Sequence, residues 1–143
     1  MHAPAVVTAA GALLLCAACG GATTTQPSRT WRPNALQLIS QLRGDVTAVQ
    51  SVGATRRAFT GSGDLYVLLV AYSDLGGCSS MAAETAAPER VIRVLTRPCP
   101  QLERAAALFT QAEAASSRRT LARAAHEAAL AEPALVRAAA AVG

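Results

Sequence analysis

The sequence predicts an all-α fold: about four antiparallel helices in a small bundle, stapled by one disulfide and preceded by a flexible tether. Three observations support this prediction. Apolar residues recur at helical spacing after residue 32. Cap residues and prolines separate these segments at helix-length intervals. The composition is 52% hydrophobic but only 3% aromatic, so the core should be thin and should benefit from a crosslink.

No charged side chain occurs from Ala3 to Ala18, and this run ends in small residues before a Gly/Thr/Ser stretch. This pattern is typical of an export signal that is cleaved. The ending Cys16-Ala17-Ala18-Cys19 resembles the signal of bacterial lipoproteins, although Cys16 stands where that family usually has leucine and no Lys/Arg precedes the run. The resemblance implies lipidation at Cys19 and a membrane-anchored mature protein. The alternative is a secreted protein whose signal is cut near Ala18 or Ala22.

The expected domains are therefore a signal peptide at 1–18, a flexible tether at 19–32 and a helical bundle domain at 33–143. The first helix is expected to begin near Pro33 or Asn34, because proline suits the first turn of a helix. Gly53 is expected to end it. Its apolar residues repeat on one helical face, namely Ala35, Ile39, Leu42, Val46 and Val49.

A second helix is expected from Ser62 to about residue 83. Its apolar run from Leu65 to Tyr72 also fits a strand, but its cap, its length and its helical neighbours favour a helix. Gly76-Gly77 either breaks this helix or permits a close contact, and we favour continuation.

A third helix is expected to open at Pro88. Pro98 and Pro100 each remove a backbone donor, so the helix should kink there. Its apolar face continues across them through Val91, Leu95, Pro98, Leu102, Ala105 and Phe109. Ser116 or Ser117 is expected to cap a fourth helix, in which Pro133 starts or kinks the last segment.

Cys78 and Cys99 would be the two free thiols left once a signal is removed and Cys19 is lipidated or lost. They come to similar heights in an antiparallel hairpin of the second and third helices. Two such cysteines most often join in an oxidising compartment. A redox pair or half of a metal site would need partners nearby that the chain lacks. We therefore expect a structural disulfide.

All 13 basic residues are arginines, and the net charge is +4. This mild excess favours anionic surfaces such as phospholipid head groups, and it is too weak to indicate a nucleic-acid partner. The candidate interaction face on the third helix consists of Arg90, Arg93, Arg97 and Arg104, with Arg118, Arg119 and Arg123 as further members. The plainer interpretation is a solvated face balanced by Glu89, Glu103 and Glu113.

No catalytic residues, metal ligands or cofactor are expected. His126 is the only histidine after the signal, and Leu130 stands where a zinc-protease motif needs its second histidine. The sequence thus predicts a non-enzymatic envelope protein, held to the membrane by its anchor and binding an anionic envelope component or an acidic protein. The alternative is a carrier of a small apolar ligand, with a core site formed by Leu68, Leu69, Tyr72, Leu102 and Phe109.

Overall fold

The computed structural model describes residues 29–53, 55 and 58–143. The predicted signal, the predicted lipidation at Cys19 and most of the predicted tether lie outside these residues. The described residues form seven α-helices and no strand, which confirms the all-α fold class. The helices are α1 (Trp31–Gly53), α2 (Ser62–Gly76), α3 (Cys78–Glu84), α4 (Glu89–Leu95), α5 (Cys99–Ala114), α6 (Arg118–Leu130) and α7 (Glu132–Val142).

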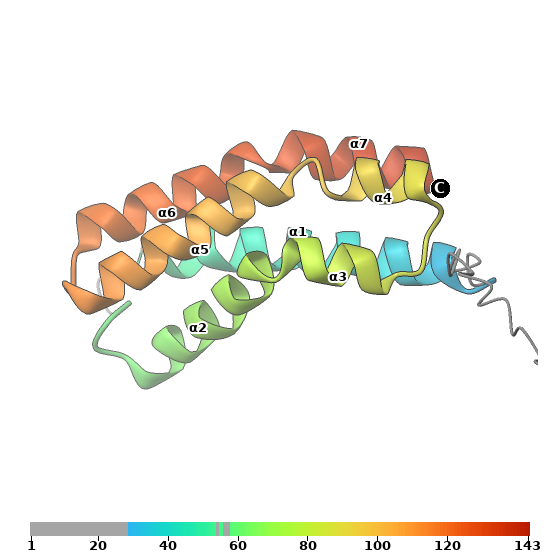
Figure 1. Ribbon diagram of the computed structural model, residues 1–143. Helices are drawn as coiled ribbons and strands as arrows, with labels where there is room; N and C mark the ends of the chain where they lie inside the picture. Colours follow the sequence, from blue (N-terminus) through green and yellow to red (C-terminus); the bar gives the residue numbers. More distant parts are fainter. Residues whose placement is uncertain (1–28, 54, 56–57) are drawn as a thin grey trace, which may run out of the picture.

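The seven helices make four arms. Successive arms run in opposite directions, across Figure 1 from one side to the other and back. The first arm is α1, and the others are the pairs α2–α3, α4–α5 and α6–α7. α1 packs against α2, α6 and α7, while α5 packs against α2 and α6. The arms therefore close into the antiparallel bundle that the sequence predicts.

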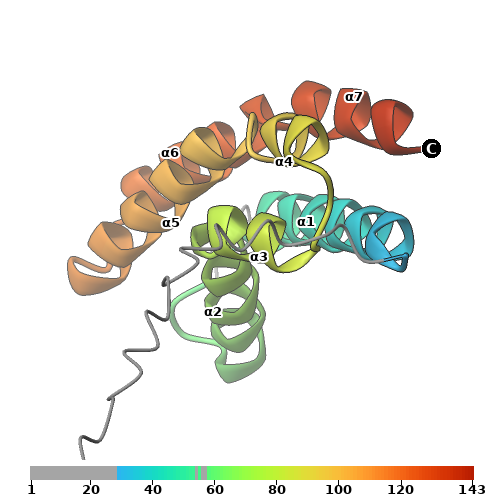
Figure 2. The ribbon, with the colours of Figure 1, turned by 45° about the vertical axis from the view of Figure 1, so that its right-hand side comes forward.

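Three arms are broken, and each break lies where the sequence has a glycine or a proline. α2 and α3 meet at Gly77 with a bend of 61°, so that α2 leans away from the other helices in Figure 2. α4 and α5 are separated by a short turn that ends at Pro98. α7 follows α6 after Ala131, with Pro133 in its first turn. The predicted continuation of the second helix across Gly76-Gly77 is therefore wrong, because α2 ends at Gly76 and α3 begins at Cys78. The third helix is interrupted by a turn at residues 96–98 where the sequence predicts a kink, because the prolines there remove backbone donors. Pro133 lies at the start of the last segment, as predicted.

The core is formed by the helical faces that the periodicity predicts. All five predicted residues of α1 are buried, as are the six predicted residues of the third arm. α1 begins at Trp31, before the predicted start, and the Asn34 N–H donates to the Thr30 carbonyl at 3.3 Å. Trp31 and Arg32 consequently belong to the folded body and not to the tether.

The predicted disulfide between Cys78 and Cys99 is present, with the two Cα atoms 5.3 Å apart. Both cysteines are buried, and each is the first residue of its helix, α3 and α5. One residue further on, the Ser79 hydroxyl donates to Glu103 Oε1 at 2.6 Å. The second and third arms are therefore joined by a covalent bond and a hydrogen bond at the same level of the bundle.

Candidate functional site

The four arginines of the predicted interaction face lie along one arm of the bundle. Arg90 and Arg93 lie on α4, Arg97 lies in the turn after it, and Arg104 lies on α5. All four side chains are exposed. The structure therefore places these four residues, the arginine face, on the surface of the third arm.

Two members of the arginine face have an acidic neighbour. Arg93 Nη1 lies 3.7 Å from Glu89 Oε1, and Arg104 Nη1 lies 3.8 Å from Glu127 Oε2. The Arg93 and Glu89 side chains are 71% and 85% exposed. Exposed ion pairs contribute only about 0–1 kcal/mol, so a stronger anionic partner can displace them. Within the described residues, neither Arg90 nor Arg97 takes part in an ion pair.

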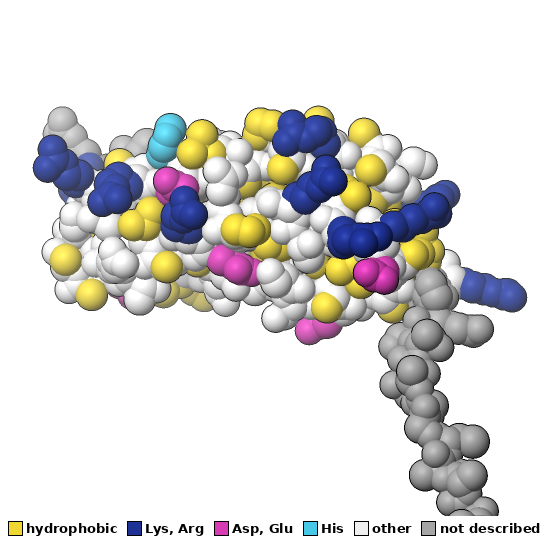
Figure 3. Space-filling view, turned by 45° about the horizontal axis from the view of Figure 1, so that its top comes forward, with side chains coloured by type: hydrophobic (Ala, Val, Ile, Leu, Met, Phe, Trp, Pro, Cys, Tyr) yellow, Lys and Arg dark blue, Asp and Glu magenta, His cyan; other side chains and the backbone are white. Residues whose placement is uncertain are grey.

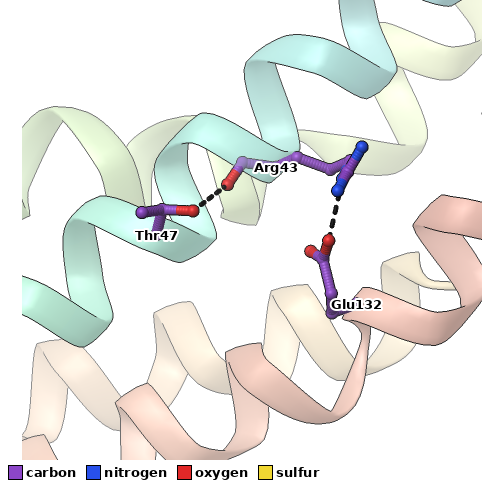
Figure 4. A network of polar contacts seen from close by, with 3 residues as sticks. All are labelled: Arg43, Thr47 and Glu132. Carbon is purple, nitrogen blue, oxygen red and sulfur yellow. Dashed lines mark hydrogen bonds and ion pairs between the residues drawn. The ribbon is translucent and has the colours of Figure 1, made fainter.

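The acidic residues of this side of the molecule are largely engaged with neighbouring helices. Residues 89–143 contain eight arginines and five glutamates. Glu132 Oε1 accepts from Arg43 Nε of α1 at 2.8 Å, and the Arg43 carbonyl accepts from the Thr47 hydroxyl (Figure 4). Glu103 accepts from Ser79 of α3. These two carboxylates contact residues of neighbouring helices while the arginine face is exposed, so the net charge of the surface is positive.

The basic surface extends beyond the third arm. Figure 3 shows arginine side chains over the length of the face formed by α4–α7, with fewer acidic side chains between them. Arg118 donates to the Thr55 carbonyl at 3.2 Å, which ties α6 to the loop after α1. The remaining exposed arginines of the fourth arm are Arg119, Arg123 and Arg137. By contrast, residues 62–88 contain three acidic residues and no basic one.

A pocket of about 450 Å³ lies where α1 begins and α7 ends. Its wall includes Trp31 and Arg32 of α1, Arg90 and Val94 of α4, and Val142 of α7. Arg90 thus belongs both to the arginine face and to this pocket. The pocket was not predictable from the expected domains, because Trp31 and Arg32 fall within the predicted tether at 19–32. The one signal that could have indicated it is the single tryptophan of the chain beside the first helix.

Four of the five residues predicted for the alternative carrier site are buried in the core. Leu68, Leu102 and Tyr72 are buried, and the Tyr72 and Phe109 rings stack with their centroids 4.4 Å apart. The placement of Leu69 in that core is wrong, because its side chain is 41% exposed. It borders a surface groove between α2 and α5 instead. Tyr72 and Phe109 border the same groove.

α2 is apolar on nearly all sides and leaves part of that surface exposed. Its exposed large apolar residues are Tyr66, Val67, Leu69 and Val70. In the described part of the chain, no single helix has the length and apolar character needed to span a membrane. α2 and α3 together meet that requirement by length and composition only, across their 61° bend.

Two buried polar groups between the helices have perturbed acidity. Burial, and to a smaller extent the nearby Asp74 carboxylate, raises the pKa of the Asp45 carboxyl to about 6. Burial also raises the pKa of the Tyr72 hydroxyl. Asp45 Oδ2 and the Tyr72 hydroxyl have no hydrogen-bond partner among the described residues. Asp45 therefore favours its neutral form more strongly in the folded chain than in the unfolded one.

No group of three or more His, Cys, Asp or Glu side chains that could hold a metal ion occurs among residues 29–53, 55 and 58–143. Comparison of the chain with protein-family models, with curated proteins and with solved structures finds no match.

Proposed function

We propose that this chain is an exported envelope protein, lipid-anchored at Cys19, which acts by binding and not by catalysis. Its arginine face would contact an anionic envelope surface such as phospholipid head groups. One observation carries this proposal: Trp31, the first residue of α1, borders the same pocket as Arg90. The end of the body that the tether reaches is therefore the end at which the arginine face begins.

The length of the tether is compatible with this contact. Twelve peptide units separate Cys19 from Trp31, and fully extended they span at most about 40 Å. The electrostatic attraction of a membrane surface falls off over about 8 Å at physiological ionic strength. A body held within this reach would repeatedly bring Arg90, Arg93 and Arg97 into the region where head groups attract them.

The energetics favour several arginines acting together. Each basic side chain near an anionic membrane surface contributes about 1 kcal/mol. Three of them would contribute about 3 kcal/mol, which corresponds to roughly a hundredfold in partitioning. Because the arginines of this face are exposed, they reach head groups without any change in the packing of the bundle.

The test is cosedimentation of the proposed mature chain, residues 19–143 carrying Cys19→Ser, with phosphatidylglycerol vesicles at low salt. The triple variant Arg90→Gln/Arg93→Gln/Arg97→Gln should bind roughly a hundredfold more weakly. The matched control Gln37→Glu/Ser40→Glu/Gln50→Glu removes the same net charge at exposed positions of α1. The control should bind like the parent chain, and added salt should weaken the binding of the control and of the parent chain.

Equal binding by the triple variant and the parent chain would refute the role of the arginine face. Equal loss in the triple variant and in the control would show that net charge alone attracts the chain, and it would refute this face as well. Binding to an acidic protein but not to vesicles would assign the face to a protein partner in place of the membrane.

A further inference from the structure

We propose that the pocket between the start of α1, α4 and the end of α7 binds one acyl chain of an anionic amphiphile. The acyl chain would lie against the apolar wall, and the carboxylate or phosphate head would pair with Arg32 and Arg90. This inference deepens the proposed function, on which it rests for the source of its ligand.

The size and the wall of the pocket fit an apolar chain. Its volume of about 450 Å³ falls within the range of small-molecule sites, which is about 300–1,000 Å³. Val91 and Val94 come from α4, Val142 comes from α7, and the Trp31 ring comes from α1. Val91 and Val142 are 9% and 2% exposed, so they form part of the rigid core. A chain placed here would bury apolar surface at about 25 cal/mol per Å².

The charge of the pocket selects an anion. Among the described residues, Arg32 and Arg90 are the only charged side chains that line the pocket, and no carboxylate side chain lines it. The Arg32 guanidinium lies 5.4 Å from the centre of the Trp31 ring, a cation–π distance that keeps it close to the apolar wall. Neither arginine forms an ion pair with any described residue. Two guanidinium groups beside an apolar cavity match a head that carries negative charge and is attached to a hydrocarbon chain.

Other ligand classes fit this combination less well. A free inorganic anion would leave the valine wall and the Trp31 ring without a partner. A neutral apolar molecule would leave the two guanidinium groups unused, and a cationic amphiphile would be repelled by them. A free fatty acid and a membrane lipid share the required chemistry, and the experiment below distinguishes them.

Trp31 provides the measurement, because it is the only tryptophan of the chain and it borders the pocket. The proposed mature chain, residues 19–143 carrying Cys19→Ser, is titrated with dodecanoate below its micelle concentration. We expect a saturable shift of the Trp31 emission to shorter wavelength as hydrocarbon replaces water at the ring. Dodecyltrimethylammonium, which has the same chain and the opposite charge, should give no shift.

Two pairs of variants localise the ligand. Ala141→Phe fills the pocket and should abolish the shift, whereas Ala140→Phe, at the exposed neighbouring position outside the pocket, should retain it. Arg90→Gln should weaken dodecanoate binding about tenfold, because a charge-assisted hydrogen bond is lost. Arg123→Gln, the same change on α6, should leave the affinity unchanged.

The outcomes separate this inference from the proposed function. A shift with both dodecanoate and phosphatidylglycerol vesicles assigns the ligand to the membrane, and a shift with dodecanoate alone assigns it to free fatty acids. Vesicle binding without any shift of Trp31 overturns the pocket but not the arginine face. A dodecanoate shift without vesicle binding overturns the arginine face but not the pocket. An equal response to the cationic amphiphile, or an unaltered response in Ala141→Phe, overturns the pocket.

Discussion

Cys78 is bonded to Cys99, and each of these residues opens the helix that follows a break in its arm. The disulfide therefore joins the α2–α3 bend directly to the α4–α5 turn. Gly77 and Pro98 interrupt the regular helix at these two places, so neither arm is held straight by its own backbone hydrogen bonds. The covalent bond joins the second and third arms to each other at the breaks in both.

Replacing both cysteines by alanine should lower the free energy of unfolding by about 3 kcal/mol, because the 21-residue separation closes a loop of moderate length. In a domain of this size the loss corresponds to a fall in Tm of roughly 10 °C or more. Calorimetry of the parent chain under non-reducing conditions provides the reference. Ser79→Ala, beside the disulfide, should cost far less, and an equal Tm for the double variant and the parent would contradict a stabilising crosslink.

Gly44→Ala should stabilise the chain by about 0.5–1 kcal/mol in urea unfolding. Gly44 lies within α1, and a methyl group at this position would meet no atom within 4 Å. Gly76→Ala is the matched comparison, since its new Cβ would lie 3.2 Å from the Ala106 Cβ of α5. That contact should cancel the gain in helix propensity. A larger gain at Gly76 than at Gly44 would show that α2 and α5 are not closely packed there.

Asp45 should make stability fall as pH rises from about 3.8 to about 6. Its pKa is raised to about 6 in the folded chain, so the folded state binds the proton more tightly than the unfolded state does. The stabilisation by protonation is complete below pH 3.8 and is lost as the pH passes 6. Asp45→Asn should remove this dependence and add about 1 kcal/mol at pH 7, allowing for solvent screening.

Asp74→Asn is the control for the Asp45 experiment, because the Asp74 charge is the second cause of the raised pKa. This variant should move the Asp45 transition to lower pH without removing it. Urea unfolding at pH 4, 5, 6 and 7 measures both effects. Parallel pH profiles of stability for the parent chain and Asp45→Asn would show that Asp45 does not cause the pH dependence.

Ser117→Ala should lower the free energy of unfolding by about 1 kcal/mol. The Ser117 hydroxyl caps α6 by accepting from the Thr120 N–H at 3.2 Å. Ser116, its neighbour, has φ of 46°, a conformation that favours glycine. Ser116→Gly should therefore stabilise the chain, opposite in sign to Ser117→Ala. Thermal unfolding of the two variants measures both changes, and two changes of the same sign would contradict this geometry.

The local features of the fold were predictable from the sequence because they depend on spacing within one helix. The apolar face from Val91 to Phe109 continues across Pro98, and the structure buries it as predicted. The Ser117 cap, the end of α1 at Gly53 and the disulfide follow from the same kind of pattern. Each involves residues whose relative positions are fixed by helical geometry or by simple pairing.

Other features were not predictable because they depend on how distant segments meet. The run from Leu65 to Tyr72 is apolar on every side, so its spacing cannot tell which residues face the core, and Leu69 was assigned wrongly. The pocket joins Trp31, Arg90 and Val142 from three arms, and no pattern along the chain connects them. The arginine face was recognised on the third arm, but its place beside the start of α1 required the structure.

The most direct test of the central proposal is the intact mass of the protein from membrane and culture fractions of its natural host, measured without reductant. The proposal predicts a membrane-bound species that begins at Cys19, carries added acyl mass and is two hydrogens lighter than the reduced chain. A full-length, unmodified chain with four free thiols would contradict export, lipidation and the disulfide together. A species cut near Ala18 or Ala22 and found in the culture medium would contradict the anchor alone.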